Sequence, residues 1–492
     1  MNQLPRALYR TEQVRELDRM AIEDFAIAGY TLMQRAGQAA FDVLRTRWPQ
    51  AKKILVAAGT GNNGGDGYVV AQCAKAVGLD VRVVQFGDAG RLRGDAFTAR
   101  EAYLAAGSEV DSCDDGVLPP ADAIVDALLG TGLRQEVRED LKSAIEAINA
   151  HPAPVLAIDV PSGLHSDTGV PLGTAVKASC TISFIGLKQG LFTGQAADYC
   201  GAVYFDDLQA PAGIYTRQQA AAWRIDLAQF SELLARRARA SHKGHFGHVL
   251  VIGGERGMSG APRMAGEAAA RVGAGLVSVA TRAVNAPVVN TARPELMVHA
   301  TEKPADLKPL LKRATVVALG PGLGQASWSR ALLDAIVKID TPKVIDADGL
   351  NLLATDPVSR EDWVLTPHPG EAARLLGENT ATIQGDRYHA VRMLQARYGG
   401  VCVLKGAGSL ISSKERIAVC TAGNPGMASG GMGDVLTGVI AGLLAQSLNG
   451  QQAAELGVCL HAAAADMAAA DGGERGLLAT DLFAYLRRLS NL

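Results

Sequence analysis

The segment with the clearest chemical content is residues 421–446, TAGNPGMASGGMGDVLTGVIAGLLAQ. It reads as a glycine-rich loop that ends at Gly433-Asp434 and runs directly into an apolar helix. Loop N–H groups and the positive end of a helix dipole bind anions and can stabilise a phosphoryl group during transfer. Asp434 is placed to take a proton from a hydroxyl group, and we expect the helix dipole to lower its pKa and keep it ionised at pH 7. The alternative for such an aspartate is a plain helix N-cap.

Two upstream segments could complete a site around Asp434. LKGAGSLI, residues 404–411, predicts a strand, a glycine turn and a second strand, with Lys405 beside the phosphates of a nucleotide. A simple hairpin is the alternative, because a lone GxG is a weak signal. LTPHPGEAARLL, residues 365–376, places His368 and Glu371 between a strand and a helix, and its prolines fix the turn that carries His368.

The first half of the chain carries a different set of polar strand ends. GTGNNGGDG, residues 59–67, lies between a strand and a helix, where backbone N–H groups bind pyrophosphate, although it lacks the GxGxxG register. Asp126 ends one predicted strand, and Asp159 and Ser162 end another. Ligands gather at the carboxyl ends of parallel strands, so we expect one crevice here. A tight turn and ordinary helix caps are the alternatives.

The order of the predicted elements indicates two α/β domains. Strands at 52–59, 81–87, 121–130, 155–163 and 180–186 alternate with helices at 67–78, 94–106 and 138–150, after a helical preamble at 11–47. This alternation predicts a Rossmann-like doubly wound sheet. A basic helix that ends over 233–240 then precedes strands at 248–254, 276–281, 315–322, 343–348 and 401–406. The boundary is expected within 209–225, giving domains 1–215 and 226–492.

Composition excludes several classes of partner. The 492 residues exceed one hydrophobic core, and a net charge of -2 gives no electrostatic reason to bind nucleic acid or an anionic membrane. Seven cysteines without a CxxC pair argue against a disulfide framework or a zinc site and fit a reducing compartment. The N-terminus has no apolar signal-peptide core, and HKGHFGH (242–248) is interpreted as a loop rather than a metal site. We expect a cytoplasmic protein that acts on small molecules.

Two groups of motifs resemble one enzyme family. GNNGGDG, DALLGTGL and IDVPSGL, within about residues 10–210, resemble the N-terminal epimerase domain of NAD(P)H-hydrate repair enzymes. HKGHFGHVLVIGG, GMSGAPRMAGEAAARVGAGLV, ALGPGLG, VIDADGLN, LTPHPGE and GNPGMASGGMGDVLTG, within about 226–490, resemble their C-terminal dehydratase domain, which has a ribokinase-like α/β fold. The resemblance implies that the chain is a homo-oligomeric, bifunctional repair enzyme.

For the first domain the resemblance implies interconversion of R- and S-NAD(P)HX, the hydrated cofactors. The implied substrate contacts are Asn62, Asn63, Gly64, Gly65, Asp66, Gly130, Thr131, Gly132, Leu133, Arg134, Gln135, Glu136 and Asp159. Asn63, Asp126 and Ser162 resemble the family's potassium ligands, and oxygen donors of this kind suit a hard cation. Epimerisation needs proton transfer or ring opening at the hydrated carbon, which makes Asp159 the candidate acid/base. Lys188 is a weaker candidate, since a lysine just after a strand is expected to be exposed.

For the second domain the resemblance implies dehydration of S-NAD(P)HX with ADP as the phosphate donor and Mg²⁺. The implied substrate contacts are Ala261, Gly322, His368 and Asp434. The implied nucleotide contacts are Lys405, Gly406, Ala407, Gly408, Ser409 and Gly433. Asp434 would activate the hydroxyl for attack on the terminal phosphoryl group, and phosphate then leaves more easily than hydroxide.

Two alternatives stay open at this stage. The Gly433-Asp434 apparatus would equally serve a kinase for a small hydroxylated metabolite, which differs in that its product keeps the phosphate. The first domain could be a binding module without catalysis. The residues alone do not decide NADHX against NADPHX, or ADP against ATP.

Overall fold

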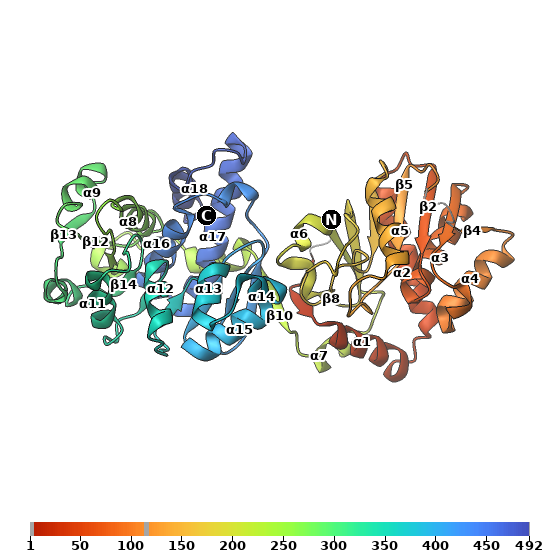
Figure 1. The fold of residues 1–492 in the computed structure, drawn as a ribbon, viewed down its shortest axis with the longest axis horizontal. Coiled ribbons are helices and arrows are strands. Elements are labelled where there is room, and N and C mark those ends of the chain that lie inside the picture. The colour runs from red at the N-terminus through yellow and green to blue at the C-terminus, as the bar shows by residue number, and fades with distance from the viewer. Residues whose placement is uncertain (1–3, 113–117, 492) are drawn as a thin grey trace. The chain divides into compact units, whose positions relative to one another are not determined.

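The computed structural model describes residues 4–112 and 118–491, and the chain divides into two compact units, residues 1–223 and 224–492 (Figure 1). Cys113, one of the cysteines considered above, lies outside the described residues. Both units are α/β, as the alternation of strand and helix patterns predicts, and the first has a Rossmann-like parallel sheet.

The first unit is built on a seven-stranded sheet in the order β4-β3-β2-β5-β6-β7-β9. All of its neighbouring strands are parallel. The strands are β2 (Lys53–Ala58), β3 (Asp80–Gln85), β4 (Val110–Ser112), β5 (Ala123–Ala127), β6 (Val155–Ile158), β7 (Cys180–Phe184) and β9 (Ala202–Asp206). Their carboxyl ends therefore meet at one edge, where the polar strand ends predicted from the sequence lie.

Helices cover both faces of this sheet. Ile54, Val56 and Ala58 of β2 join the core formed with α1 (Thr11–Arg19), α2 (Gly29–Arg47), α3 (Asn62–Ala76) and α4 (Gly94–Ala105). Leu55 and Ala57 of the same strand join the core on the opposite face, under α5 (Glu139–Ala150). Successive side chains of a strand point to opposite faces, so an apolar run such as β2 is buried on both sides.

The N-terminal segment is anchored to the rest of this unit. Strand β1 (Ala7–Tyr9) pairs in parallel with β8 (Leu187–Lys188) and antiparallel with β10 (Ala222–Ile225). Thr11, at the start of α1, donates from its backbone N–H to Asp167 Oδ1 at 2.7 Å. The predicted helical preamble is present as α1, a π-helical turn at Met20–Asp24, and α2. The short helices α6 (Ala196–Tyr199) and α7 (Ala212–Arg217) complete the unit.

The second unit contains strands in the order β13-β12-β11-β14-β15-β16-β17-β18-β19. The neighbours from β13 to β17 are parallel, and β17, β18 and β19 are antiparallel. The parallel strands are β11 (His248–Ile252), β12 (Leu276–Thr281), β13 (Met297–Ala300), β14 (Val316–Leu319), β15 (Lys343–Ile345), β16 (Trp363–Leu365) and β17 (Val401–Leu404). β18 (Ser409–Ser412) and β19 (Ile417–Cys420) complete the sheet.

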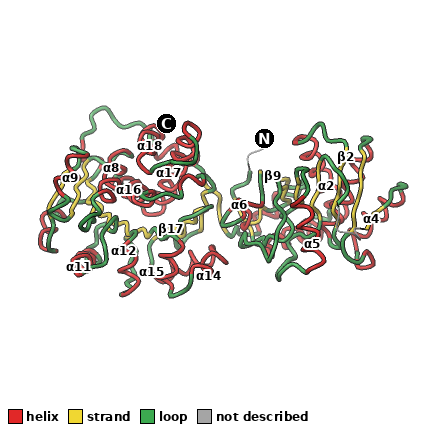
Figure 2. Tube along the Cα trace, turned by 45° about the horizontal axis from the view of Figure 1, so that its top comes forward, coloured by secondary structure: helices red, strands yellow, loops and turns green. Residues whose placement is uncertain are grey.

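Two groups of helices sandwich these strands (Figure 2). One face carries α8 (Gly260–Arg271), α16 (Met432–Ala445), α17 (Gly450–Gly472) and α18 (Leu482–Leu489). The other carries α11 (Ser327–Ile336), α12 (Asp348–Thr355), α14 (Thr380–Gly385) and α15 (Arg387–Tyr398). The remaining helices are α9 (Ala286–Ala292), α10 (Lys308–Leu311) and α13 (Pro369–Leu376).

Glycine sets the distance between helices α8 and α16. A Cβ at Gly438 of α16 would lie 2.0 Å from the carbonyl oxygen of Ala265 in α8. Only glycine allows that approach. The apolar segment 435–445 is thus a buried helix. Helix α17 is long and apolar enough to span a membrane, but 72% of its most apolar 18-residue stretch is buried inside the fold.

Two local predictions are wrong. The basic segment 233–240 is not an α-helix: a 3₁₀ helix ends at Leu234, and Arg237 instead lies 3.5 Å from the ring centre of Phe246 and donates to Gly273 O. These tertiary contacts of Arg237 hold the segment after Leu234 in a non-helical conformation. The segment 59–67 is a loop only up to Gly61, because the helix already begins at Asn62.

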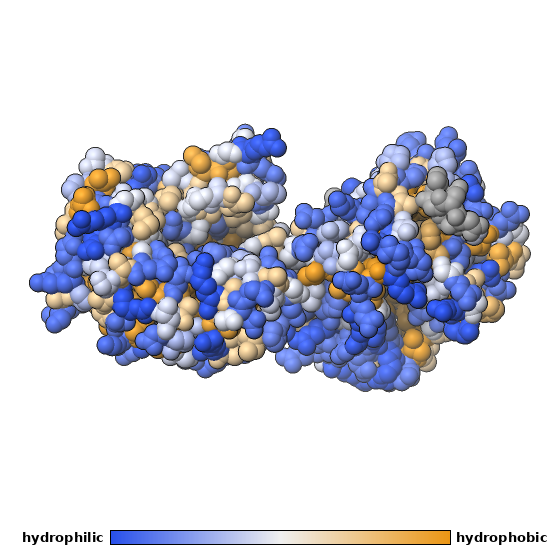
Figure 3. Space-filling model, in the orientation of Figure 1, coloured by the Kyte–Doolittle hydropathy of each residue, from blue (hydrophilic) through white to orange (hydrophobic). Residues whose placement is uncertain are grey.

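The face of the molecule in Figure 3 is mostly hydrophilic, with small apolar patches. The six cysteines of the described part are free thiols, and Sγ of Cys459 lies 3.8 Å from that of Cys420.

Candidate functional site

A cavity of about 620 Å³ opens at the carboxyl edge of the first sheet. Eight of the predicted substrate contacts line this cavity: Asn62, Asn63, Asp66, Gly130, Thr131, Gly132, Leu133 and Asp159. Gly64 and Gly65 do not: a Cβ on Gly64 would lie 2.1 Å from Gly59 O, and one on Gly65 would lie 2.6 Å from Met33 Cε. These glycines let the first turn of α3 pack closely. Arg134, Gln135 and Glu136 are exposed and lie outside the lining residues.

Asp126 and Ser162 form a buried pair behind this cavity. Ser162 donates from Oγ to Asp126 Oδ1 at 2.5 Å and from its backbone N–H to Oδ2 at 2.8 Å. Burial raises the pKa of the Asp126 carboxyl to about 6, while the bonds from Ser162 and Leu128 oppose that rise. A buried carboxylate beside a hydroxyl is a favourable place for a cation.

Asn63 supplies the third predicted cation ligand. Its side chain is 8% exposed, and its Nδ2 has no hydrogen-bond partner within residues 4–112 and 118–491. Rotating the amide by 180° exchanges its nitrogen and oxygen, which would turn an unsatisfied donor into an oxygen ligand. The residues therefore fit a cation bound through oxygen atoms.

Lys188 is buried rather than exposed, contrary to the expectation from sequence. It is 1% exposed, and Nζ contacts Asp159 Oδ1 and also donates to Phe184 O at 3.0 Å. Lys188 belongs to the short strand β8, which pairs with β1 so that Lys188 lies opposite Tyr9. Asp159 follows β6 with a positive φ of 66°, a conformation that points its carboxylate at the lysine and is uncommon for residues other than glycine.

Asp18 also lines the cavity, and the sequence analysis missed it. Burial raises the pKa of Asp18 to about 6; Lys188 opposes the rise and Asp159 adds to it. Burial, with Asp159 and Asp18, holds the pKa of Asp66 well above its usual range. A signal for Asp18 was available, because it lies on the same side as the buried Val14 and Leu17 of α1 and the buried Ala21 of the π-helical turn that follows.

In the second unit, Asp434 lies at the start of α16 among other carboxylates. Lys405 donates to Asp346 Oδ1 at 2.7 Å, and Thr437 donates to Asp346 Oδ2 at 2.8 Å. Lys405 Nζ also lies 3.7 Å from Glu371 Oε2. A Cβ on Gly433 would lie 3.2 Å from Lys405 Nζ, so the lysine faces the turn that carries Asp434.

The expected low pKa of Asp434 is wrong. Burial raises its pKa to about 7, Asp346, Asp348 and Glu371 add to the rise, and Lys405 opposes it. Desolvation and neighbouring negative charge outweigh the helix dipole here. A carboxylate that titrates near pH 7 suits a general base better than one that is always ionised.

The predicted strand, glycine turn and strand over 404–411 is the antiparallel pair β17–β18. Lys405 points from it to Asp346 and Glu371. Arg387, which is 1% exposed, donates from Nη2 to the carbonyl oxygens of Leu404 and Lys405, each at 3.2 Å. Arg387, which the sequence analysis did not identify, thus fixes the backbone at the start of this turn.

The predicted substrate contacts of the second unit fall on two sides. Ala261 and Gly322 are adjacent, since a Cβ on Gly322 would lie 3.2 Å from that of Ala261. His368 caps α13, where its Nδ1 accepts from Gly370 N–H at 3.0 Å and its Nε2 lies 3.5 Å from Glu371 Oε1. Partial burial lowers the pKa of His368, which favours the neutral ring. The fixed histidine between a strand and a helix is confirmed.

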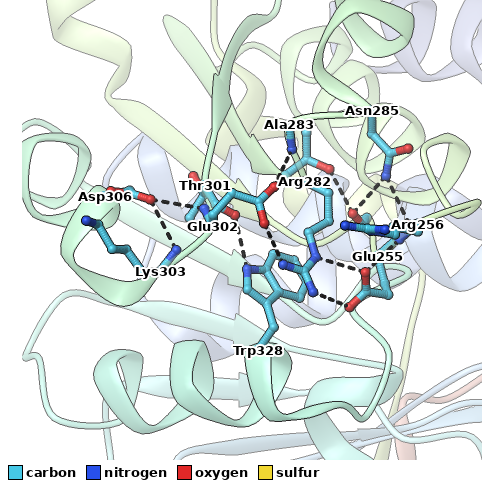
Figure 4. Close-up of polar contacts among 12 residues, drawn as sticks. Glu255, Arg256, Arg282, Ala283, Asn285, Thr301, Glu302, Lys303, Asp306 and Trp328 are labelled. Atoms are coloured by element: carbon cyan, nitrogen blue, oxygen red, sulfur yellow. Dashed lines mark hydrogen bonds and ion pairs between the residues drawn. The ribbon is translucent and has the colours of Figure 1, made fainter.

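A polar network braces the loop that carries Gly322 (Figure 4). Arg282, after β12, donates to Glu255 Oε1 at 2.9 Å and to Glu302 Oε2 at 2.7 Å, and lies 4.3 Å from the ring centre of Trp328. Glu255 donates from its backbone N–H to Gly322 O at 2.7 Å. The ends of β11, β12 and β13 are thereby tied to the loop after β14.

The histidine run 242–248 is a loop that enters the first strand of the second unit, as predicted. His242 begins a 3₁₀ turn, and His248 begins β11 with Nε2 2.9 Å from Ser278 Oγ. In the described parts of the chain, no three His, Cys, Asp or Glu side chains are arranged to hold a metal ion.

Comparisons with known proteins match the two parts of the chain to two different families. Residues 29–190 match the family described as YjeF-related protein N-terminus, and residues 249–488 match the family described as NAD(P)H-hydrate dehydratase. A bifunctional NAD(P)H-hydrate repair enzyme from Coxiella burnetii is 52% identical over 98% of this chain and 99% of its own length. One from Escherichia coli is 47% identical over 99% of this chain and 95% of its own length.

A solved ribokinase-like superfamily protein from Enterococcus faecalis is similar to 54% of this chain, with a TM-score of 0.51, 30% identity and 94% of that protein covered. Fold and sites together thus define a two-domain α/β enzyme with a Rossmann-like and a ribokinase-like unit. The chain belongs to the family of bifunctional NAD(P)H-hydrate repair enzymes.

Proposed function

We propose that the protein repairs hydrated nicotinamide cofactors through two activities. It epimerises R- and S-NAD(P)HX, and it dehydrates the S epimer to NAD(P)H with ADP as phosphate donor, releasing AMP and phosphate. Residues 1–215 form the epimerase domain and residues 226–492 the dehydratase domain. The observation that carries the proposal is the similarity to bifunctional repair enzymes over 98% of the chain, with a polar site present in each unit.

The epimerase substrate would lie in the cavity of the first unit. Asn62, Asn63, Asp66 and the segment 130–133 line that cavity, which supports their role as contacts. Gly64 and Gly65 would act by shaping α3, and residues 134–136 would contact the substrate only where it extends to the surface. Asp159, fixed by Lys188, would face the hydrated ring.

The dehydratase step begins at Asp434. Its carboxylate would take the proton of the substrate hydroxyl as the oxygen attacks the terminal phosphoryl group of ADP. Lys405, the segment 406–409 and Gly433 would hold the nucleotide, and Ala261, Gly322 and His368 would hold the substrate. The C–O bond then breaks, phosphate leaves with the electron pair, and loss of a ring proton restores the dihydronicotinamide.

Two cations belong to the proposal. Asn63, Asp126 and Ser162 would hold K⁺, which supplies positive charge beside the epimerase site; the buried Asp126 carboxylate supports this. Mg²⁺ would accompany the nucleotide, since Mg²⁺ usually combines phosphate oxygens with one or two protein carboxylates. The acidic side chains grouped around Asp434 suit that arrangement.

The substrates are small molecules, and we further propose a cytoplasmic homo-oligomer that binds neither nucleic acid nor membrane. The alternative, a kinase for a small metabolite, would use the same Asp434 apparatus. The test is to incubate pure S-NADHX with ADP and Mg²⁺ and to identify the products. We expect NADH, AMP and inorganic phosphate in equal amounts, whereas a stable phosphorylated product would indicate the kinase.

A further inference from the structure

Four carboxyl groups line the cavity of the first unit, those of Asp18, Asp66, Asp95 and Asp159. Asp159 and Lys188 act on the pKa of both Asp18 and Asp66, so these four side chains lie together, whereas Asp95 lies in the first turn of α4 and is not among the groups that act on those pKa values. Asp159 is engaged by Lys188. Within residues 4–112 and 118–491, by contrast, no hydrogen-bond donor or cation within ion-pair distance reaches the carboxyl oxygens of Asp18 or Asp66. An ion-paired carboxylate is a poor proton donor and a weakened base. Beside the Asp159–Lys188 pair, the two carboxyl groups of the described residues that are placed to exchange protons with a ligand are therefore Asp18 and Asp66.

Asp18 is held in the cavity by the way α1 is anchored. Thr11 bonds to Asp167 at the start of the helix, and Val14, Leu17 and Ala21 bury the same helical face. Arg19 points away from that face, where it pairs with Glu16 at 2.7 Å and Glu23 at 2.6 Å. The carboxyl group of Asp18 thus approaches from α1, while that of Asp66 comes from the first turns of α3.

The surroundings favour different protonation states for the two groups. Asp66 has its pKa held well above the usual range, by burial first, which favours its proton-donating form. Asp18, with a pKa of about 6, is mainly ionised at neutral pH. The other charged groups that face the cavity are Asp159, Lys188, Arg15, Asp95 and Arg138. One acid and one base are thus available together.

We propose that Asp18 and Asp66 are the catalytic base and acid of the epimerase site, an assignment that rests on the proposed epimerase function. In the hydrated cofactor the carbon that bears the hydroxyl adjoins the ring nitrogen. Asp18 removes the hydroxyl proton, a carbonyl bond forms, and the carbon–nitrogen bond breaks with its electron pair moving to nitrogen. Asp66 protonates that nitrogen.

Rotation of the open-chain aldehyde exposes its other face. The nitrogen then attacks the carbonyl carbon, Asp66 takes its proton back, and Asp18 returns a proton to the oxygen. The product is the opposite epimer, no electrons are gained or lost, and both carboxyl groups end in their starting states. The Asp159–Lys188 pair provides fixed charge beside the ring.

The test follows epimerisation of pure R-NADHX by the full-length protein carrying Asp18→Asn or Asp66→Asn. Each variant should lose about 100-fold or more of its epimerisation kcat. Its dehydration rate on S-NADHX should remain that of the unsubstituted protein, and its thermal midpoint should not fall, because each substitution removes a buried carboxyl group of raised pKa. Glu16→Gln is the matched control, because Glu16 is exposed on the opposite side of α1 and should keep the full rate.

A second measurement uses only the unsubstituted protein, so it does not require that any variant folds. For the unsubstituted protein, epimerisation kcat should fall below about pH 6 as Asp18 becomes protonated. A rate that stays level between pH 5 and pH 8, or either Asn variant with near-normal epimerisation, would overturn the assignment. If the unsubstituted protein does not epimerise at all, the proposed function fails, and this result is distinct from loss in the variants alone.

Discussion

Lys405 Nζ lies 2.7 Å from Asp346 Oδ1, and this pair stands beside Asp434. Its two members act on Asp434 in opposite directions, since the carboxylate of Asp346 raises the pKa of Asp434 and the ammonium group of Lys405 lowers it. The pKa of about 7 at Asp434 therefore reflects burial and carboxylate repulsion together, moderated by one lysine. The pKa of the proposed base is thus set by burial and by residues that follow β15 and β17 or lie in the first turns of α12 and α13.

Opposite substitutions in this pair should shift the pH dependence of dehydration in opposite directions. Lys405→Met removes the charge that lowers the pKa of Asp434, so the acidic limb of kcat should move to higher pH. Asp346→Asn removes a charge that raises it, so the limb should move to lower pH. The measurement is kcat against pH at saturating ADP, with the exposed Lys414→Met as a control that leaves the profile unchanged. Shifts in the same direction would contradict the proposed balance.

Asp434→Asn should abolish dehydration while the nucleotide still binds. The amide has the shape of the carboxyl group but accepts no proton, so kcat should fall by about 10² to 10⁴-fold. Affinity for ADP, measured by calorimetry, should change less than tenfold, because Lys405 and the turn after β17 are untouched. Dehydration within tenfold of normal in this variant would remove Asp434 as the base.

The same variant should be more stable than the unsubstituted protein at alkaline pH. Asp434 has a folded-state pKa of about 7, above the usual 3.8, so ionisation destabilises the fold progressively as pH rises from about 4 to about 7. At pH 8 the amide avoids this cost, which we expect to be about 2 kcal/mol after relaxation of the site. Denaturant unfolding at pH 8 and pH 4 measures the difference, which should vanish at pH 4. A variant less stable at pH 8 would contradict the raised pKa.

Potassium should accelerate epimerisation and leave dehydration of the S epimer unaffected. Asp126 is buried, and its carboxylate is the charge that would hold the cation. Epimerisation should rise to a plateau as K⁺ is added to a choline buffer of constant ionic strength. Asp126→Asn should lose this response, and a rate independent of K⁺ in the unsubstituted protein would argue against the cation site.

The sequence predicted the elements of the fold well where both faces of a strand are buried. The apolar run of β2 and the glycine loop before α16 leave few alternatives for the local structure. The segment 233–240 failed because its helical pattern competes with the tertiary contacts of Arg237. The local pattern of apolar and polar residues gives no information on such tertiary contacts.

The burial and the pKa shifts of the candidate site residues could not be predicted from the sequence. Lys188 was expected to be exposed because it follows a predicted strand, but it lies in the short strand β8, which pairs with β1, far away in sequence. The pKa of Asp434 depends on Asp346, Asp348 and Glu371, which reach it from other strands and helices. Asp18 was missed although an acidic residue on the apolar face of α1 is itself a signal.

The most direct test of the two coupled activities uses an equilibrated mixture of R- and S-NADHX with ADP, Mg²⁺ and K⁺, followed by absorbance near 340 nm. Dehydration of the S epimer alone would leave the R epimer behind. We predict that all of the NADHX becomes NADH, with Asp18→Asn converting the S epimer rapidly and the R epimer about 100-fold or more slowly than the unsubstituted protein does. Conversion by the unsubstituted protein that stops when the S epimer is consumed, or the absence of any NADH, would contradict the account.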